Sequence, residues 1–364
     1  MSIPKRLQQD KGNGVAIHSQ PIEARIDWLL QLSQSHSEQF CNPDNHLARR
    51  RYLAEHPTEI LALKCMDGRI HLPVATQTPM GIIQPFRNLG GIFDLGWPYL
   101  GDLLADRVQT AVNQRRRVLV IITYHFSRGE KTRGCAGFNC DKDAAKAHAF
   151  DIAKQVQTIF GRAHQTVYPL VCGFETDEDA LLLHTTPEHC FNLADWPEAD
   201  LAQLSAQLYR LYPNMPEQMR RDLLPLAEGN VRHISEIRRS KRTLAIEHRE
   251  WVICVGRGFD FLHVPNVALI VGPYSPDLAH PIRTAADIIR TNMDKGRIPD
   301  DGFLLLSSAP FQEAGPDQAR AAVKAQFMAE FAADVIKEGQ PELAEKMRVR
   351  TGILNWPTRK LSLL

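Results

Sequence analysis

Residues 63–70, LKCMDGRI, lie at the end of an apolar run and contain three residues that could do chemistry. Cys65, Asp67 and Arg69 stand two positions apart, and alternate side chains of an extended strand point to the same side. A metal site could use a thiol, an acid and a base arranged in this way. A solvated salt bridge beside a buried thiol has the same pattern, so these three residues alone leave both interpretations open.

Two more candidate ligands follow the most apolar stretch of the chain. His125 and Cys135 have nine residues between them in the segment YHFSRGEKTRGCAG, and Cys140 lies in the same loop. Two cysteines and one histidine are the ligand set of a catalytic zinc that keeps its fourth position open for water. Thiolates favour zinc over magnesium or calcium. A single cysteine or histidine is more often a core residue or a hydrogen-bonded polar group, and Cys140 is a rival for Cys135.

An α/β framework is expected to bring these residues together. The alanine-rich segment between Asp141 and Gly161 predicts a helix with an aspartate N-cap and a glycine at its end. Apolar runs predict strands at residues 59–65, 117–126, 166–176 and 180–186. Because these strands alternate with a helix, we expect an α/β sheet that is partly parallel.

Further elements are expected on both sides of this framework. Apolar side chains recur at helical spacing in residues 21–40, 45–56 and most of 197–243. A second α/β segment follows, with strands expected at 249–256, 266–273 and 302–308 and helices at 282–293 and 316–338. We therefore divide the chain into an N-terminal tail and helical region, a catalytic domain and a C-terminal domain, at 1–57, 58–243 and 244–364.

The composition is typical of a soluble globular protein with more than one domain. The chain has 364 residues, of which 44% are hydrophobic and 23% charged, and a formal net charge of +1. A balanced charge gives no electrostatic reason to expect nucleic acid or a membrane as a partner. The apolar runs are shorter than the ~20 residues of a membrane span, and the N-terminus lacks the apolar core of a signal peptide. Seven scattered cysteines fit a reducing compartment, so we expect a cytoplasmic protein.

Several motifs, in order, resemble those of one enzyme family. CMDGR has the Cys-x-Asp-x-Arg form of β-class carbonic anhydrases, and RNLGG at 87–91 resembles the Arg-Asn-x-Gly segment that follows it there. Most of that class has His-x-x-Cys. The glycine after Asp67 and the long loop between His125 and Cys135 are instead similar to the carboxysomal shell branch. GFETDEDALLLH and GRGFDFLHVPNVAL also resemble segments of that branch, so the resemblance covers about residues 58–350.

The resemblance implies a site and a reaction. Cys65, His125 and Cys135 would hold zinc (Zn2+), which can lower the pKa of its water from 15.7 to about 7. Asp67 would accept a hydrogen bond from the attacking hydroxide and orient a lone pair towards carbon dioxide. Arg69 would keep Asp67 ionised and away from the metal. A freed Asp67 could become the fourth ligand, a closed form that is the resting state of some β-class enzymes. The expected reaction is the reversible hydration of carbon dioxide to bicarbonate and a proton.

The resemblance also implies an architecture and partners. In this branch the C-terminal domain is a degenerate copy of the catalytic domain. Since Cys254 is the one cysteine after residue 243, we expect a single zinc per chain. A homodimer or higher homo-oligomer is expected. The branch carries a long N-terminal extension used in packaging, to which this sequence has little counterpart. Residence in a carboxysome, with its shell or Rubisco as partner, is therefore a separate expectation from catalysis.

Two alternative functions stay open at this point. The first is another zinc lyase or hydrolase on the same scaffold, such as a carbon disulfide hydrolase, because substrate choice depends on the shape of the access tunnel. The second is a non-catalytic assembly protein with a vestigial zinc site. Asp67 and Arg69 argue against the second alternative, since a structural zinc needs neither of them.

Overall fold

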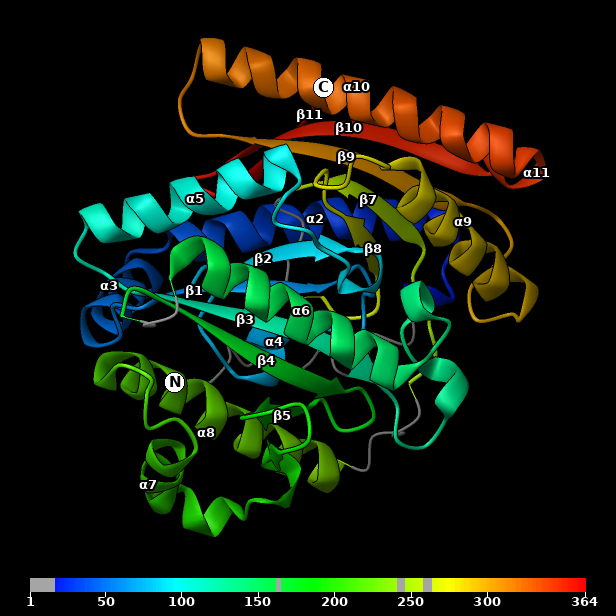
Figure 1. Cartoon of the computed structure of the whole chain (residues 1–364). Coiled ribbons are helices and arrows are strands. Elements are labelled where there is room, and N and C mark those ends of the chain that lie inside the picture. The colour runs from blue at the N-terminus through cyan, green and yellow to red at the C-terminus, as the bar shows by residue number, and fades with distance from the viewer. Residues whose placement is uncertain (1–16, 162–164, 241–245, 258–263) are drawn as a thin grey trace.

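The computed structural model describes residues 17–161, 165–240, 246–257 and 264–364, which fold around two β-sheets (Figure 1). The first sheet has the strand order β2-β1-β3-β4-β5-β6. Its first four strands are mutually parallel, and β5 and β6 continue it in antiparallel pairs. The bounds are β1 (Glu59–Cys65), β2 (Ile83–Asn88), β3 (Val118–Phe126), β4 (Val167–Glu175), β5 (Ala180–His184) and β6 (Cys190–Asn192). The predicted α/β fold with a partly parallel sheet is confirmed.

The second sheet repeats the topology of the first. Its strand order is β11-β10-β9-β7-β8, so β8-β7-β9-β10-β11 runs in the same sense as β2-β1-β3-β4-β5. Each pair is parallel except the last, β10 with β11, just as β4 pairs antiparallel with β5. The bounds are β7 (Val252–Gly256), β8 (Ala268–Val271), β9 (Phe303–Phe311), β10 (Met347–Asn355) and β11 (Lys360–Leu363). A degenerate second copy would have this topology, but the origin of the repeat stays a prediction.

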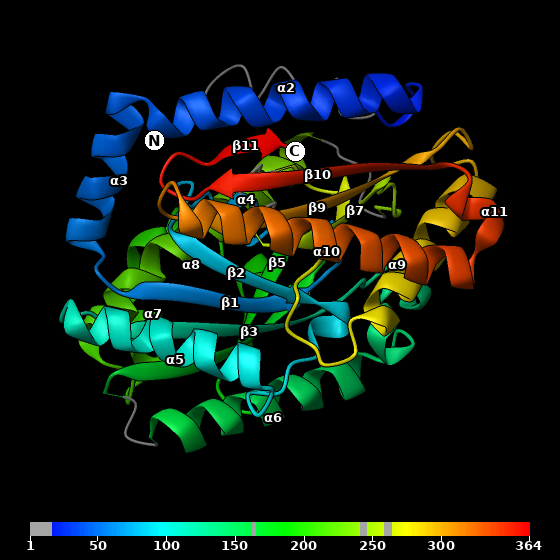
Figure 2. The same ribbon diagram turned by 90° about the horizontal axis from the view of Figure 1, so that it is seen from above.

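Helices cover the faces of both sheets. α6 packs against β3 and β4, and α10 packs against β9 and β10 at the matching place. Figures 1 and 2 show α2 and α10 on opposite sides of the second sheet. Within the described residues, no helix combines the length and the apolar character that a membrane crossing requires. The bounds are α2 (Ile22–Cys41), α3 (Pro43–Glu55), α4 (Leu72–Ala75), α5 (Pro98–Asn113), α6 (Lys142–Phe160), α7 (Leu201–Leu211), α8 (Glu217–Ser240), α9 (Ala279–Asp294), α10 (Pro316–Gly339) and α11 (Pro341–Ala344).

The end signals of the helix before β4 act as the sequence predicts. The side chain of Asp141 accepts hydrogen bonds from the backbone amides of Asp143 and Ala144, and α6 ends before Gly161, which has a φ of 92°. The strands expected after residues 59, 117, 166 and 180, and the helices on both flanks, are present with small shifts of their ends. Seven of the helices and strands were not predicted: β2, α4, α5, β6, β10, α11 and β11. The expected N-terminal tail up to residue 15 lies outside the described residues.

Both faces of the first sheet are buried, in two separate cores. Leu61 and Leu63 of β1 face a core that also contains side chains of α5 and α6. Ile60 and Ala62 face the opposite way, into a core that continues through Trp251 and the second sheet. A strand that is buried on both faces has a continuous run of apolar residues, which is why β1 and β3 could be predicted from the sequence. The two halves therefore share one core, and the proposed boundary near residue 244 stays a prediction.

Candidate metal centre

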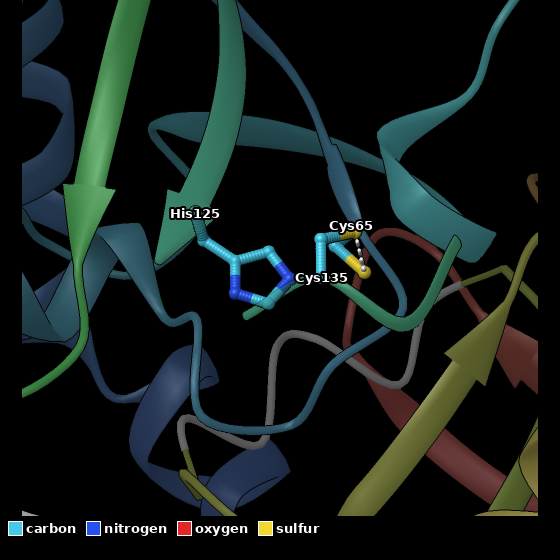
Figure 3. A group of neighbouring side chains, drawn as sticks. All are labelled: Cys65, His125 and Cys135. Carbon is cyan, nitrogen blue, oxygen red and sulfur yellow. Dashed lines mark hydrogen bonds between the residues drawn. The ribbon is translucent and has the colours of Figure 1, made fainter. Parts of the chain in front are cut away.

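Cys65, His125 and Cys135 converge at the carboxyl ends of the inner strands β1 and β3 of the first sheet (Figure 3). Cys65 is the last residue of β1, and His125 lies near the end of the neighbouring parallel strand β3. The loop after β3 returns Cys135 to the same place. All three side chains are buried, and their ligand atoms lie within 4.8 Å of one another. The two Sγ atoms are 3.9 Å apart.

The geometry and chemistry of these donors fit a zinc ion. Two zinc–sulfur bonds of about 2.3 Å at a tetrahedral angle would place the sulfur atoms about 3.8 Å apart. Among the described residues, neither ring nitrogen of His125 has a hydrogen-bond partner, although both are buried. A metal ion would satisfy one of these nitrogens, and a buried polar atom without a partner is costly otherwise. Cys140 lies outside this group, because its thiol donates to the Thr132 carbonyl at 3.3 Å.

The two thiols differ in their readiness to ionise. Burial opposes the ionisation of Cys65, but the hydrogen bond from the Cys135 thiol and the nearby His125 hold the pKa of Cys65 well below its usual value. The hydrogen bond to Cys65, together with burial, raises the pKa of Cys135 well above its usual value. One thiolate is thus favoured before metal binds. Metal binding would then release the remaining thiol proton.

Arg69 clamps Asp67 beside the three candidate ligands. Its Nη2 atom donates to Asp67 Oδ2 at 2.6 Å, its Nε atom to Oδ1 at 3.1 Å, and its backbone amide to Oδ1 at 2.8 Å. Burial alone would raise the pKa of Asp67. The charge of Arg69, followed by His248 and His125, instead holds that pKa well below its usual range. Asp67 is therefore an ionised, bidentate partner of Arg69, and its Oδ2 atom lies 3.8 Å from His125 Nε2.

The RNLGG segment holds the strand ends together. Arg87 donates to the carbonyls of Cys65, Asp67 and Ile70, at 3.2, 2.7 and 2.8 Å. Gly90 and Gly91 have positive φ values, 69° and 66°, which residues with a side chain rarely adopt. A Cβ on Gly137 would also lie 2.7 Å from the Cα atom of the first of them. Backbone-to-backbone packing at this point thus lets the loop that carries Cys135 approach the end of β1.

An acidic turn between β4 and β5 fixes the start of that long loop. Asp177 accepts hydrogen bonds from the hydroxyl of Ser127 at 2.8 Å and from the amides of Arg128 and Gly129 at 3.0 and 2.8 Å. Glu178 pairs with Arg128 at 2.9 Å. The turn residues DED, which the sequence indicates only as a hairpin connection, therefore also anchor the segment between His125 and the second thiol.

The second half of the chain contributes His248 and Glu250, which the sequence analysis did not assign to the site. His248 Nε2 lies 3.7 Å from Asp67 Oδ2, and its Nδ1 atom lies 2.9 Å from Glu250 Oε2. Glu250 has no exposed surface and accepts a hydrogen bond from the amide of Gly68 at 3.2 Å. Burial would raise the pKa of Glu250, but His248 lowers it below its usual value. The His-x-Glu spacing just before a predicted strand was the available signal.

Close contact with the second sheet explains the glycine in CMDGR. The carbonyl of Gly68 accepts from the amide of Asn266 at 2.7 Å, and the carbonyl of Met66 accepts from Ile270 at 3.0 Å. A Cβ on Gly68 would lie 2.7 Å from the carbonyl oxygen of Ala268, closer than Cβ atoms come in practice. The motif loop and β8 therefore run side by side, with the backbone of one against the other.

A buried set of two cysteines and one histidine thus lies beside a clamped aspartate at the ends of parallel strands, and this set could hold a metal ion. Residues 56–220 match the family model described as Carboxysome Shell Carbonic Anhydrase, catalytic domain. These residues therefore form a carbonic anhydrase catalytic domain of the carboxysome shell type, and the resemblance predicted from the motifs is confirmed there.

Two further comparisons add little to this match. A solved structure titled "The structure of the beta-carbonic anhydrase CcaA" is similar at 18% identity, over 40% of this chain and 90% of that chain, with a TM-score of 0.28. A TM-score this low supports no argument about fold or function. The comparison with curated proteins found no match.

Proposed function

We propose that this protein catalyses the zinc-dependent reversible hydration of carbon dioxide to bicarbonate and a proton. The observation that carries the proposal is the buried group of Cys65, His125 and Cys135 beside an aspartate that Arg69 holds in two places. Zinc at this group would lower the pKa of a water from 15.7 to about 7 and so supply hydroxide at neutral pH.

The side chains around the ligands have distinct roles in this proposal. Asp67 would accept a hydrogen bond from the attacking hydroxide. This hydrogen bond would direct a lone pair of the hydroxide oxygen towards carbon dioxide. Arg69 keeps Asp67 charged and turned away from the three ligands, because its guanidinium group contacts both carboxylate oxygens. His248, oriented by Glu250, lies beside Asp67 where it can accept the proton that must leave after each turnover.

The decisive experiment is a carbon dioxide hydration assay on purified protein, with metal analysis of the same sample. We expect activity that follows the zinc content and disappears when a chelator removes the metal. A Cys41→Ser variant, which changes an exposed cysteine, is the matched control for Cys65→Ser. Fully zinc-loaded protein without hydration activity would contradict the proposal.

The two alternatives remain distinguishable in the same assay. A zinc lyase or hydrolase with another substrate would be inactive on carbon dioxide and active on a compound such as carbon disulfide. A non-catalytic assembly protein would bind zinc and turn over neither. The pairing of Asp67 with Arg69 favours catalysis, since structural zinc needs four protein ligands and no clamped carboxylate.

We further propose a homodimer or higher homo-oligomer in the cytoplasm or the carboxysome. The description of the matching family names the carboxysome shell, so the shell and Rubisco are the partners to test. An exposed apolar patch supports self-association, because Val323 and Phe327 on α10 are 67% and 65% exposed. Light scattering of the purified chain tests the oligomer, and sedimentation with isolated carboxysomes tests the location.

A further inference from the structure

Five basic side chains gather beyond the carboxyl ends of β7 and β10 in the second sheet, and none of them belongs to the candidate metal centre. Arg257 directly follows β7, and Arg359 lies in the turn between β10 and β11. Arg49 comes from α3, Arg107 from α5 and Lys324 from α10. Figure 2 shows β10 running towards the side of the molecule where α3 lies. We call these five residues the basic cluster.

Two aromatic rings hold three of the guanidinium groups together. The Cζ atom of Arg359 is 3.6 Å from the ring centre of Trp356 and 5.1 Å from that of Phe40. The same Trp356 ring is 5.9 Å from Arg257, and the same Phe40 ring is 3.7 Å from Arg49. Because each ring is shared by two arginines, the three guanidinium groups must lie around one small region.

Arg107 and Lys324 are linked to this region through Arg257. Lys324 donates to the hydroxyl of Tyr99 at 3.1 Å. Burial would raise the pKa of Tyr99, but Lys324 and Arg257 lower it below its usual value, as two cations near the phenolic hydroxyl would do. Burial and the charge of Arg257 lower the pKa of Arg107. All five cations therefore lie close to one another, around Trp356, Phe40 and Tyr99.

Among the described residues, the five cations of the cluster lack a paired carboxylate. Arg359 is 6% exposed, and its Nε and Nη1 atoms have no hydrogen-bond partner among the described residues. Burial, followed by Arg49, Arg107 and Arg257, lowers the pKa of Arg359 to about 10, so the group is still charged at neutral pH. In the part of the chain that the structure describes, none of the five forms an ion pair with a carboxylate.

Two acidic side chains lie near Arg107. Glu59 and Asp106 partly offset the lowered pKa of Arg107. A buried charge without a partner is expensive, so such groups in proteins normally hold a counter-charge. Guanidinium groups match the oxygens of phosphate in a bidentate manner.

The position of the cluster in the fold is where ligands bind to open α/β sheets. Such ligands lie beyond the carboxyl ends of the strands, at the point where the strand order reverses. In the first sheet that point is between β1 and β3, where the candidate metal ligands Cys65 and His125 lie. In the second sheet it is between β7 and β9, and Arg257 is the residue that follows β7.

We propose that Arg49, Arg107, Arg257, Lys324 and Arg359 form a binding site for a small, multiply charged phosphate anion. The number of cations favours phosphate or pyrophosphate over bicarbonate, which carries a single charge. The burial of Arg359 favours a small ligand over an acidic peptide, which would contact the surface. This site is separate from the metal centre and does not depend on the proposed carbon dioxide chemistry.

Isothermal titration of the full-length, zinc-loaded protein with pyrophosphate and with inorganic phosphate tests the proposal. The ionic strength is held constant with sodium chloride, and the zinc content is measured before and after. We expect saturable binding with one site per chain. Arg359→Gln should weaken binding at least tenfold. Arg348→Gln should bind like the wild type, because Arg348 of β10 pairs with Glu23 of α2, outside the cluster.

Further variants keep the test decisive if Arg359→Gln does not fold. Arg257→Gln and Lys324→Gln change less buried members of the cluster, and each should weaken pyrophosphate binding several-fold. The proposal is wrong if the wild type gives no saturable heat with either anion. It is equally wrong if chloride competes as well as phosphate does at equal ionic strength, or if the folded cluster variants bind as tightly as the wild type.

Discussion

At the scale of single residues, the chemistry depends most on where Asp67 is held. Its Oδ2 atom is 2.6 Å from Arg69, 3.8 Å from His125 and 3.7 Å from His248. In the proposed function, a carboxylate in this position would either bind the reacting hydroxide or become a ligand of the metal. The guanidinium group of Arg69 favours the first arrangement. If Asp67 moved away from it, the charge of Arg69 would stay buried without a partner.

Asp67→Ala tests the catalytic half of this balance. The variant should keep its zinc, because the three ligands are unchanged, and kcat for hydration should fall about 10²-fold, as when one positioned catalytic hydrogen bond is lost. Stopped-flow hydration assays with metal analysis measure both quantities. Turnover equal to that of the wild type would contradict the role of Asp67.

Arg69→Ala tests the restraint on the same carboxylate. Without Arg69 the carboxylate of Asp67 should move to the metal and close its fourth position. X-ray absorption on the zinc-loaded variant should then show two sulfur, one nitrogen and one carboxylate oxygen ligand, with little activity. Arg348→Ala, which breaks a partly exposed ion pair with Glu23, is the control and should leave the coordination unchanged. An active Arg69→Ala enzyme would defeat the idea.

Glu250→Gln tests whether His248 carries protons out of the site. The amide keeps the size of the side chain but removes the charge that orients the imidazole. We expect unchanged zinc content, a kcat about 10-fold lower in dilute buffer, and recovery as the buffer concentration rises. The loss should be smaller than the ~10²-fold effect of removing an acid–base group, because His248 itself is retained. A loss of kcat that buffer does not restore would indicate a structural role for Glu250.

At the scale of elements, the metal centre rests on contacts between backbones. Gly68 lies against Ala268 of β8, and Gly137 lies against the first glycine of RNLGG. These contacts bring three strand ends and a long loop within reach of one another.

Gly68→Ala should therefore weaken the fold and the site together. Its new Cβ would lie 2.7 Å from a backbone oxygen, and neither partner can rotate away. We expect the free energy of unfolding to fall by about 1–3 kcal/mol, as for overpacked sites, with lower activity. Urea denaturation measures the first effect. Gly339→Ala is the control, because its Cβ would meet only the side chain of Arg283, at 3.9 Å.

The elements also differ in how far the sequence could predict them. β1, β3 and α6 were predicted because local signals, apolar runs and end caps, determine them. β2 contains Pro85 and polar residues, and its place is set by parallel pairing with β1. Glu250 meets Gly68 across 182 positions of the chain. Local pattern carries no information on such contacts. The sequence therefore indicated Cys65, His125 and Cys135, which the structure brings together, but not the dyad of His248 and Glu250.

At the scale of the whole molecule, two sheets of the same topology differ in what they carry at their switch points. The first has two thiols and an imidazole, and the second has arginines. The segment that matches the family model ends at residue 220, so the dyad of His248 and Glu250 and the second sheet come from outside it. The second half therefore completes the site of the first by covering the motif loop and adding side chains beside Asp67.

Because the candidate metal ligands come from the first sheet, we expect one zinc per chain. The second half contains a single cysteine, Cys254, which is buried in β7. Asp67, His248 and Glu250 also form a group of possible ligands, but Arg69 contacts both oxygens of Asp67 and its charge would repel a second cation. Metal analysis should give about one equivalent for the wild type, consistent with a set of two cysteines and one histidine.

Three cysteine variants decide between one site and two. The zinc content should fall towards zero in Cys65→Ser and Cys135→Ser, since each removes a ligand and metal affinity depends on the complete set. Cys254→Ser should keep its zinc, because its thiol lies against Ser308, 4.0 Å away, and not at the metal centre. Two equivalents in the wild type, or loss of zinc on changing Cys254, would show that the second sheet carries a metal site of its own.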